Sequence, residues 1–247
     1  MRQTESYLTK KIGVFVKLSA NELGYLEDLQ AKPIHLSAGT ELVHEGGVGQ
    51  TAYIFESGWA CSFKSLADGG RQIISFPVPG DCVGLRSMLL RTSDHSLTTV
   101  TDTTVIPVEA RRLREMFSEF PYLGTALLWA TSRDEAMIVE HLVSLGRRDA
   151  MERTAHFILE LHDRLQLVGI ATKQEFDCPL NQLVLADVLG LSTVHVNRVL
   201  RLLRERELVT FRDHKVTIHD LEALKTLAGY VSPQEAFSPH SPDDAII

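Results

Sequence analysis

Apolar and polar positions follow two different patterns along the chain, and the change falls near residue 110. From 36 to 107, short apolar runs such as 52–55 and 72–76 are separated by Gly, Asp and Pro. Many short strands with regular turn signals are typical of an all-β sandwich or barrel. The sequence Asp68-Gly69-Gly70 between two runs predicts a hairpin, because glycine adopts positive φ at little cost. Before this region, leucines at helical spacing predict a short amphipathic helix over about 14–34.

Helical spacing dominates after residue 110. Pro121 suits the first turn of a long helix, which we expect to run to about Leu145 and to end at Gly146 as the C′ residue. This helix carries one stripe at three-to-four spacing, made of Leu127, Ala130, Asp134, Met137, His141 and Leu145. The stripe fits either core packing or the seam of a two-stranded coiled coil, and we favour the seam. A further helix is expected from Asp149 to about Leu167.

The segment 182–201 predicts two short helices joined at Gly190. A helix-turn-helix needs a small residue where its helices cross, a glycine in the turn, and an apolar residue on the second helix that faces the first. Ala186, Gly190 and Val196 have the spacing that meets these needs. Asn181 and Ser192 suit the N-caps of the two helices.

The second helix presents a polar, basic face opposite its apolar stripe. A recognition helix offers such residues to base edges in the major groove, where arginine bonds guanine, asparagine bonds adenine, and an apolar side chain touches the thymine methyl group. We predict direct readout by Arg198, assisted by Asn197, Thr193 and Val194. The candidates for phosphate contact are Gln182, Ser192, His195 and Arg201.

The composition is ordinary, and the net charge limits where a nucleic-acid site can lie. The chain has 44% hydrophobic and 23% charged residues, as globular proteins do, and a formal net charge of −7. A nucleic-acid site must therefore be a local basic patch. Such a patch surrounds the second helix: Arg198, Arg201, Arg204, Arg206, Arg212 and Lys215. The stretch 208–218 reads as two short strands with a polar turn at Arg212–His214, which is the wing expected of a winged helix.

No segment suggests a membrane or an oxidising compartment. The first residues lack the apolar run of a signal peptide, and no run of about eighteen apolar residues occurs. The three cysteines are far apart, so we expect reduced thiols and a cytoplasmic location. The tail from Ser232, rich in Pro and Ser, is expected to be disordered.

Together these residues resemble the Crp/Fnr superfamily of bacterial transcription regulators, named for the cyclic-AMP receptor protein and the fumarate–nitrate regulator. The resemblance covers about residues 14–222 and depends on HEGGVGQTAYIFESGWA, GGRQIISFPVPGDCVGL, the long helix, and LADVLGLSTVHVNRVLRLLRERELV. It implies an α+β chain: an N-terminal β-roll (a cyclic-nucleotide-binding-like, double-stranded β-helix), a long central dimerisation helix and a C-terminal winged helix-turn-helix. It also implies a homodimer, joined through about 121–145, on palindromic double-stranded DNA, and RNA polymerase as a partner.

On this basis we expect four regions. Residues 1–109 form the sensor domain with its N-terminal helix, and 110–146 form the linker and dimerisation helix. Residues 147–222 form the DNA-binding domain, and 223–247 form a terminal helix with a disordered tail.

Two departures from the family pattern bear on function. Members that bind cyclic AMP carry Gly-Glu after the Pro-Gly-Asp turn and an Arg-Ser or Arg-Thr pair about ten residues on, whereas this chain reads Gly84-Leu85 and Asp94-His95-Ser96. Leucine cannot hold a ribose and Asp94 repels phosphate, so we expect no tight binding of cyclic AMP. If an effector pocket exists, its candidate residues are Gly84, Leu85, Arg86 and Ser96. The second departure is Val194, which stands where the family often has glutamate, so we expect a different base beside the guanine read by Arg198.

Other functions fit the sequence less well. The histidines lack the spacing of a cupin metal site, and no catalytic motif occurs, so we expect neither an enzyme nor a bound metal. A cyclic-nucleotide module that acts on a protein partner leaves the recognition helix unexplained. We predict no cofactor: His44 or His95 as a haem ligand, an iron–sulfur cluster, and Cys82 as an oxidant sensor are each less favoured than ordinary side chains. An unknown small-molecule effector remains open.

Overall fold

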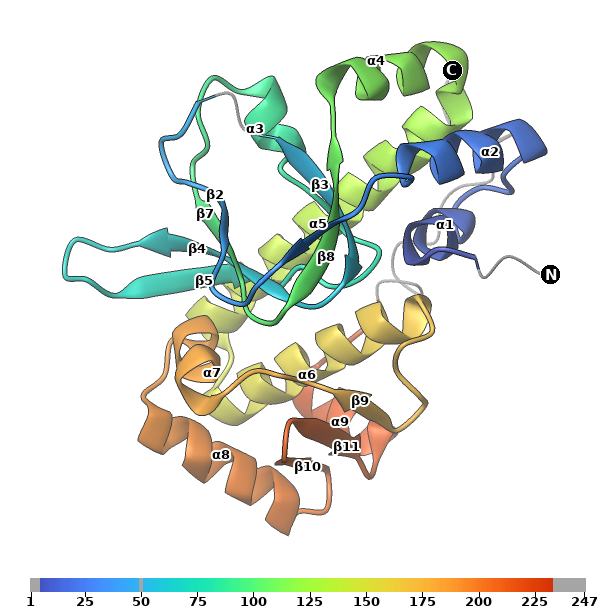
Figure 1. Cartoon of the computed structure of the whole chain (residues 1–247). Coiled ribbons are helices and arrows are strands. Elements are labelled where there is room, and N and C mark those ends of the chain that lie inside the picture. The colour runs from blue at the N-terminus through green and yellow to red at the C-terminus, as the bar shows by residue number, and fades with distance from the viewer. Residues whose placement is uncertain (1–4, 49–50, 233–247) are drawn as a thin grey trace. The chain divides into compact units, whose positions relative to one another are not determined.

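The computed structural model describes residues 5–48 and 51–232, which form two compact units. The first unit contains the described residues of 1–64 and 76–135, and the second those of 65–75 and 136–236. Figure 1 shows the order of the elements. Each unit is described by itself.

The strands of the first half of the chain form two four-stranded sheets, so the predicted β-roll is confirmed. One sheet has the order β1 (Ile34–Leu36), β8 (Thr103–Val108), β3 (Ala52–Ser57), β6 (Cys82–Val83). The other has the order β2 (Glu41–Val43), β7 (Ser96–Thr99), β4 (Ala60–Ser65), β5 (Arg71–Ser75). The hairpin predicted between β4 and β5 is confirmed: Leu66 N donates to Gly70 O over 2.8 Å, and Gly69 has a φ of +85°.

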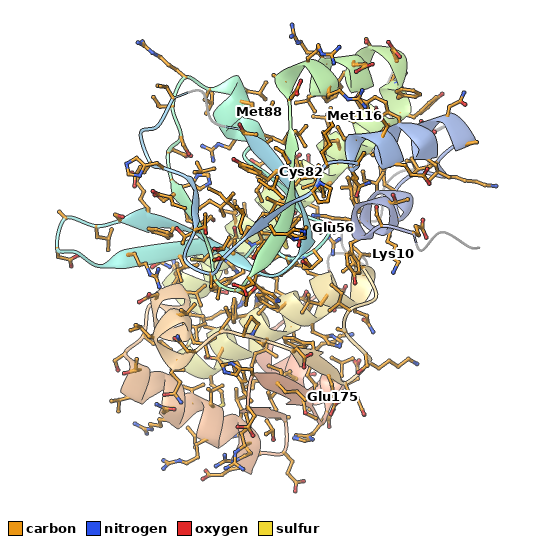
Figure 2. The ribbon with its side chains drawn as sticks, viewed as in Figure 1. Lys10, Glu56, Cys82, Met88, Met116 and Glu175 are labelled. Carbon is orange, nitrogen blue, oxygen red and sulfur yellow. The ribbon has the colours of Figure 1, made fainter. Side chains whose placement is uncertain are left out.

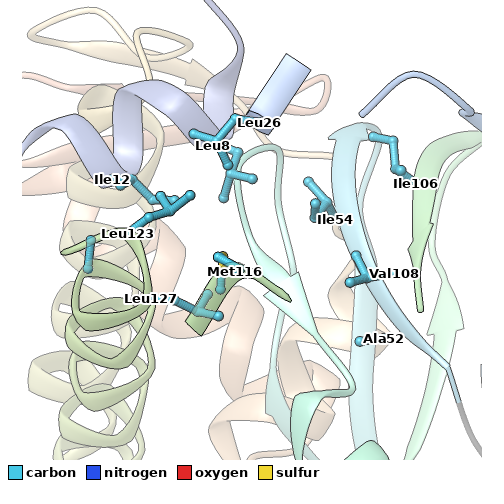
Figure 3. Packing of buried hydrophobic residues seen from close by; sticks show 11 residues of the cluster. Leu8, Ile12, Leu26, Ala52, Ile54, Ile106, Val108, Met116, Leu123 and Leu127 are labelled. Carbon is cyan, nitrogen blue, oxygen red and sulfur yellow. The ribbon is translucent and has the colours of Figure 1, made fainter. Parts of the chain in front are cut away.

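The packing of strand β3 explains why residues 52–55 form a continuous apolar run. Side chains alternate across a strand, so neighbouring residues enter different cores. Phe55 packs into a cluster with Val105 of β8, while Ile54 packs into a second cluster with Met116 and Leu123 from helices (Figure 3). Both faces of this central strand are therefore apolar, as its sequence requires.

The N-terminal helical region differs from the single helix predicted over 14–34. Two helices are present, α1 (Tyr7–Gly13) and α2 (Ala20–Leu29). Ser19 starts α2 through a capping box, in which its side chain accepts from Glu22 N while the Glu22 carboxylate accepts from Ser19 N at 2.7 Å. The start of α2 could have been predicted from the Ser-x-x-Glu sequence at 19–22. Helix α1 has only seven residues, too few to show a clear helical spacing of apolar residues.

A buried ion pair joins α1 to the turn before β6. Lys11 Nζ lies 2.8 Å from Asp81 Oδ1 and 3.3 Å from Asp134 Oδ1. The side chains of Lys11 and Asp81 are both almost fully buried. Asp81 Oδ2 also accepts from Val78 N at 2.9 Å, so its charge is held by hydrogen bonds as well as by the ammonium group.

Two further helices follow before the long one: α3 (Leu85–Leu89) and α4 (Ala110–Glu119). The long helix α5 (Pro121–Arg147) begins at the predicted proline but does not end at Gly146. Gly146 lies inside the helix and lacks the positive φ of a C′ glycine. The last turn is instead tied down by Arg153, whose guanidinium donates to Ser144 O at 2.9 Å and Leu145 O at 3.3 Å.

The stripe predicted on α5 mostly faces the interior of the chain, so the core-packing alternative describes it better than the seam. Leu127 and Ala130 are buried, Asp134 bonds Lys11, and His141 bonds Ile74 O at 3.0 Å. The exposed large apolar residues of α5 are mostly outside the stripe: Tyr122, Leu128, Ile138, Val139, Leu142 and Val143, together with Leu145 from the stripe. Periodicity identified the helix, and the burial of Leu127 and Ala130 favours the core-packing interpretation of its stripe.

The second unit is built around α6 (Ala150–Leu167), which is confirmed close to its predicted bounds. It also contains α7 (Gln182–Leu189), α8 (Thr193–Glu205), α9 (Leu221–Ala228) and a sheet of order β10 (Val209–Arg212), β11 (Lys215–Ile218), β9 (Glu175–Asp177). Ser232 is buried, and its hydroxyl donates to Asp163 Oδ2 at 2.7 Å. The rest of the tail predicted to be disordered, 233–247, lies outside the described residues.

Candidate nucleic-acid interface

Helices α7 and α8 meet at 96°, which is the geometry of a helix-turn-helix. Gly190 makes the turn with a φ of 61° and a ψ of 39°, and Leu191 N donates to Ala186 O at 3.0 Å. Ala186 and Val196 are both buried in the motif. The three residues identified by spacing therefore have the roles that the motif demands.

The predicted caps are also confirmed. Val184 N donates to Asn181 Oδ1 at 3.0 Å at the start of α7, and His195 N donates to Ser192 Oγ at 3.3 Å at the start of α8. Ser192 was predicted as a phosphate contact; its Oγ accepts this capping bond, and the residue is exposed at the N-terminal end of α8.

The two faces of α8 are sharply different. Val196, Val199 and Leu203 are buried, and Leu200 is half-buried. Val194, His195, Asn197, Arg198 and Arg201 are exposed, and Thr193 is half-buried. Val194 has 78% of its surface exposed, so its methyl groups are accessible on this face.

One hydrogen bond and one ion pair join side chains on this exposed face. Asn197 Nδ2 donates to Gln182 Oε1 over 2.8 Å, so the first residue of α7 positions a central residue of α8. Arg201 Nε lies 3.7 Å from Glu205 Oε1, one turn further along the helix. The sequence suggested Gln182 and Asn197 separately, and the fold brings them together.

The predicted wing is confirmed as the β10–β11 hairpin. Its two turn residues, Asp213 and His214, both have positive φ, at 51° and 58°. A groove of about 890 Å³ lies between the wing, the start of α7 and the start of α8. The wing residues Phe211 and Arg212 line this groove together with Asn181 and Gln182. The sequence predicted the wing at 208–218 but did not indicate that it faces the start of α7.

The candidate effector residues are engaged with other parts of the first unit. Gly84 has a φ of 78°, and a Cβ there would lie 2.7 Å from Thr51 O. Leu85 packs against the cluster that contains Met116. Arg86 donates to Asp94 Oδ2 at 2.6 Å, and Ser96 Oγ accepts from Glu45 N at 3.0 Å. The hydrogen bond from His95, followed by the charge of Arg86, lowers the pKa of Asp94, so this position is anionic.

The residues considered as an oxidant sensor or as haem ligands lie among ordinary protein contacts. Cys82 lies within the first unit (Figure 2), and burial raises the pKa of its thiol to about 12 although Lys11 opposes the shift. His44 Nδ1 lies 3.0 Å from Glu41 Oε1, and His95 Nδ1 lies 2.9 Å from Asp94 Oδ1. Within residues 5–48 and 51–232, His, Cys, Asp and Glu side chains form no group of three or more that could hold a metal ion.

Over those same ranges, no single helix has both the length and the apolar composition needed to span a membrane; α7 and α8 reach that threshold only as a bent pair.

Comparisons with known domain families agree with this architecture. A cyclic nucleotide-binding domain matches residues 33–120, and a Crp-like helix-turn-helix domain matches residues 152–227. The chain belongs to the Crp/Fnr family, whose members are transcription regulators and not enzymes.

Individual proteins are similar to this chain over most of its length. The chain is 31% identical over 192 residues to the nitrogen fixation regulation protein FixK of Rhizobium meliloti, covering 76% of this chain and 83% of that protein. It is 26% identical over 214 residues to the transcriptional activator protein Anr of Pseudomonas protegens, covering 87% of each. The solved structure of FixK2 from Bradyrhizobium japonicum superposes with a TM-score of 0.72 at 26% identity, covering 81% of this chain and 98% of that one. The chain is accordingly a DNA-binding transcription regulator of the Crp/Fnr type.

Proposed function

We propose that two copies of this chain bind a palindromic operator, with α8 of each copy in the major groove of one half-site. The observation that carries this proposal is the exposed face of α8, where Val194, Asn197 and Arg198 are presented outward while valines and leucines pack behind. Twofold symmetry sets the half-sites about one helical turn apart, roughly 34 Å centre to centre.

The side chains of α8 divide into two roles. Arg198 reads guanine, Asn197 reads the neighbouring base from the position fixed by Gln182, and Val194 touches a thymine methyl group. Thr193 assists at the N-terminal end of the helix. The contacts that position the protein on phosphates come from Gln182, Ser192, His195 and Arg201. The basic residues Arg204, Arg206, Arg212 and Lys215, all exposed, extend this positive surface.

The exposed apolar face of α5 joins the two copies. Leu128, Val139 and Leu142 are large apolar side chains left open to solvent on one long helix. Large exposed apolar patches mark interaction sites. A partner copy of α5 would cover them, which moves the seam away from the residues suggested by periodicity.

We further propose that the regulator works in the cytoplasm, without haem, an iron–sulfur cluster or cyclic AMP. Its signal would be an unidentified small molecule or its own abundance, and its target would be RNA polymerase bound beside the operator. The anionic Asp94 and the apolar Leu85 oppose a cyclic phosphate and a ribose at the two positions where the family holds them. Micromolar binding of cyclic AMP in calorimetry would contradict this part of the proposal.

The test is a selection of bound duplexes from a random pool, followed by substitution. Arg198→Ala should weaken binding to the selected operator by about 1–3 kcal/mol and relax the preference at one base pair. Arg201→Ala is the matched control on the same helix, and it should weaken all duplexes about equally and reduce the salt dependence. An equal loss on operator and random DNA for Arg198→Ala would assign Arg198 to phosphate. Failure to select any duplex at moderate salt would refute operator binding.

A further inference from the structure

The junction between α5 and α6 is bridged by one side chain of the second unit. Helix α5 ends at Arg147 and α6 begins at Ala150, so only two residues separate the helices. The last part of α5, 136–147, and the helix-turn-helix both belong to this unit. Hinges in proteins are commonly a few residues at the ends of such elements, which absorb changes in φ and ψ. A side chain that bonds both sides of the junction restricts such changes.

Arg153, near the start of α6, bonds both sides. Its Nε donates to Ser144 O over 2.9 Å, and its Nη2 donates to Leu145 O over 3.3 Å, both at the end of α5. Nη2 also donates to Arg148 O, in the junction itself, over 3.1 Å. Nη1 donates to Leu189 O, at the last residue of α7, over 2.6 Å. One planar guanidinium therefore ties the end of α5, the junction and the end of α7 together.

The contact with α7 falls at the turn of the helix-turn-helix. Leu189 directly precedes Gly190, and a Cβ placed on Gly190 would lie 3.4 Å from Leu145 Cδ2 and 3.6 Å from Arg153 Nη1. The turn therefore packs against the end of α5 and against the guanidinium. Because Val196 of α8 is buried in the motif, α7 and α8 are held together, and the position of the turn sets the position of the recognition helix.

The same part of α5 carries side chains that we propose to join the two copies. The exposed apolar residues near the end of this helix are Ile138, Val139, Leu142 and Val143. The proposed dimer contact and the recognition helix thus lie on opposite sides of the junction that Arg153 bridges. The separation of the two recognition helices in a dimer depends on this junction, and it decides which half-sites both helices reach at once.

We propose that Arg153 is a positioning residue that sets the half-site spacing recognised by the dimer, because it holds the helix-turn-helix in a fixed orientation to the end of α5. This inference rests on the proposed function, since it requires two copies on one operator. Each base pair added between half-sites moves one of them by about 3.4 Å and rotates it by roughly 35° about the duplex. A rigid connection gives a high effective concentration at the spacing that it fits and a low one at other spacings.

The test compares two arginines that bond the last turns of α5. Arg153→Met removes the side chain that reaches α7. Arg148→Met is the matched control, since it removes a side chain whose hydrogen bonds go to Glu140 and Ser144 within α5. Each protein is titrated with the selected operator, with versions lengthened or shortened by one base pair at the centre, and with a duplex that holds a single half-site.

The unaltered protein and Arg148→Met should bind the selected spacing at least about ten times more tightly than the lengthened and shortened duplexes. Arg153→Met should reduce this discrimination to about threefold or less, because a looser junction lets both helices reach several spacings. Binding to the single half-site should change by less than about twofold, since the exposed face of α8 is the same. A merely structural role would lower binding to every duplex by one factor and leave the discrimination intact.

Arg153→Lys keeps the positive charge and serves if Arg153→Met fails to fold. A lysine ammonium is a compact charge without the fork of donors that bonds α5 and α7 together, so the spacing preference should broaden here as well. The proposal is overturned if the folded variant keeps the original preference, or if Arg148→Met broadens it equally. Selection of no duplex by the unaltered protein would refute operator binding and this inference with it, whereas an unchanged spacing preference refutes only the role of Arg153.

Discussion

At the scale of single residues, Gly190 shows how local backbone geometry creates the DNA-binding motif. It ends α7 in the left-handed conformation, with a φ of 61°. Any other L-residue is strained there because its Cβ approaches the following carbonyl group. The nearest atoms to an added Cβ, in Leu145 and Arg153, lie at 3.4 Å and 3.6 Å, which is ordinary contact. The backbone conformation, and not the available space, requires the glycine.

Gly190→Ala should therefore lower the free energy of unfolding by about 1–2 kcal/mol. Gly146→Ala is the matched control, since Gly146 lies inside α5 with no atom within 4 Å of an added Cβ. It should leave stability unchanged or raise it by up to about 1 kcal/mol. Urea denaturation of both variants checks this, and a similar loss in both would mean that the turn conformation is not what matters.

The buried Lys11–Asp81 pair gives a second test at this scale. Removal of one partner of a buried ion pair leaves the other charge buried without its counter-ion, which destabilises proteins by about 3–5 kcal/mol. Lys11→Met should do so, since both side chains are almost fully buried. Lys10→Met changes the preceding residue, whose ammonium lies over the Tyr7 ring at 5.3 Å, and should alter stability by less than about 1 kcal/mol. A loss below about 1 kcal/mol in Lys11→Met, measured by denaturation, would contradict the importance of the pair.

At the scale of elements, α6 is unusual because it buries several ionisable groups along one helix: His156, Glu160, His162, Asp163 and Arg164. His141 and Glu160 form a close pair in which burial raises the pKa of Glu160, and the charge and hydrogen bond of His141 outweigh it and lower that pKa. His156 behaves in the opposite way to His141, because its pKa falls to about 4. The stability of this helix should therefore depend on pH in both directions.

For His156, the sign follows from the lowered pKa. Between pH 6.5 and about 4 the unfolded chain binds a proton at this ring and the folded chain does not, so stability falls as the pH falls. The loss amounts to up to about 3 kcal/mol. His141, whose pKa is raised, contributes stability below pH 6.5 that is lost as the pH rises through its folded pKa.

His156→Phe should remove most of the acid-side decline in the free energy of unfolding, measured by denaturation at several pH values. His44→Phe should keep the decline, since the His44 side chain is exposed. A profile for His156→Phe that parallels the original between pH 6.5 and 4 would show that the ring is protonated in the folded state.

The elements also show where sequence patterns succeed. Asn181, Gly190 and Ser192 act through contacts only a few residues away, so the bounds of α7 and α8 could be predicted closely. The end of α5 could not be predicted, because Arg153 from the next helix holds its last carbonyl groups. A side chain from elsewhere in the chain replaced the glycine cap that the local sequence suggested.

At the scale of the whole molecule, the proposed dimer depends on the apolar side chains that α5 leaves exposed. Val139, with 54% of its surface exposed, belongs to this face. Val139→Glu should shift the protein from dimer to monomer, because it would bury a charge at the seam, and it should weaken operator binding along with assembly. Sedimentation analysis measures the first effect and DNA titration the second.

The matched control is Val231→Glu, since Val231 is 62% exposed and lies outside α5. It should leave the dimer intact. An unchanged dimer in Val139→Glu would show that the two copies meet elsewhere.

The sequence by itself determined the class of this protein. It indicated a β-rich region followed by a helical region, a helix-turn-helix with its caps and wing, and a recognition helix with Val194 and Arg198 on its outward face. These features depend on short-range periodicity, turn chemistry and capping, which act within a few residues. Only the tertiary structure decided which side of α5 is exposed, that Gln182 holds Asn197, and that Arg153 joins the end of α5 to α7. Each of these depends on residues that are distant in sequence, and no local pattern specifies which distant segments will meet.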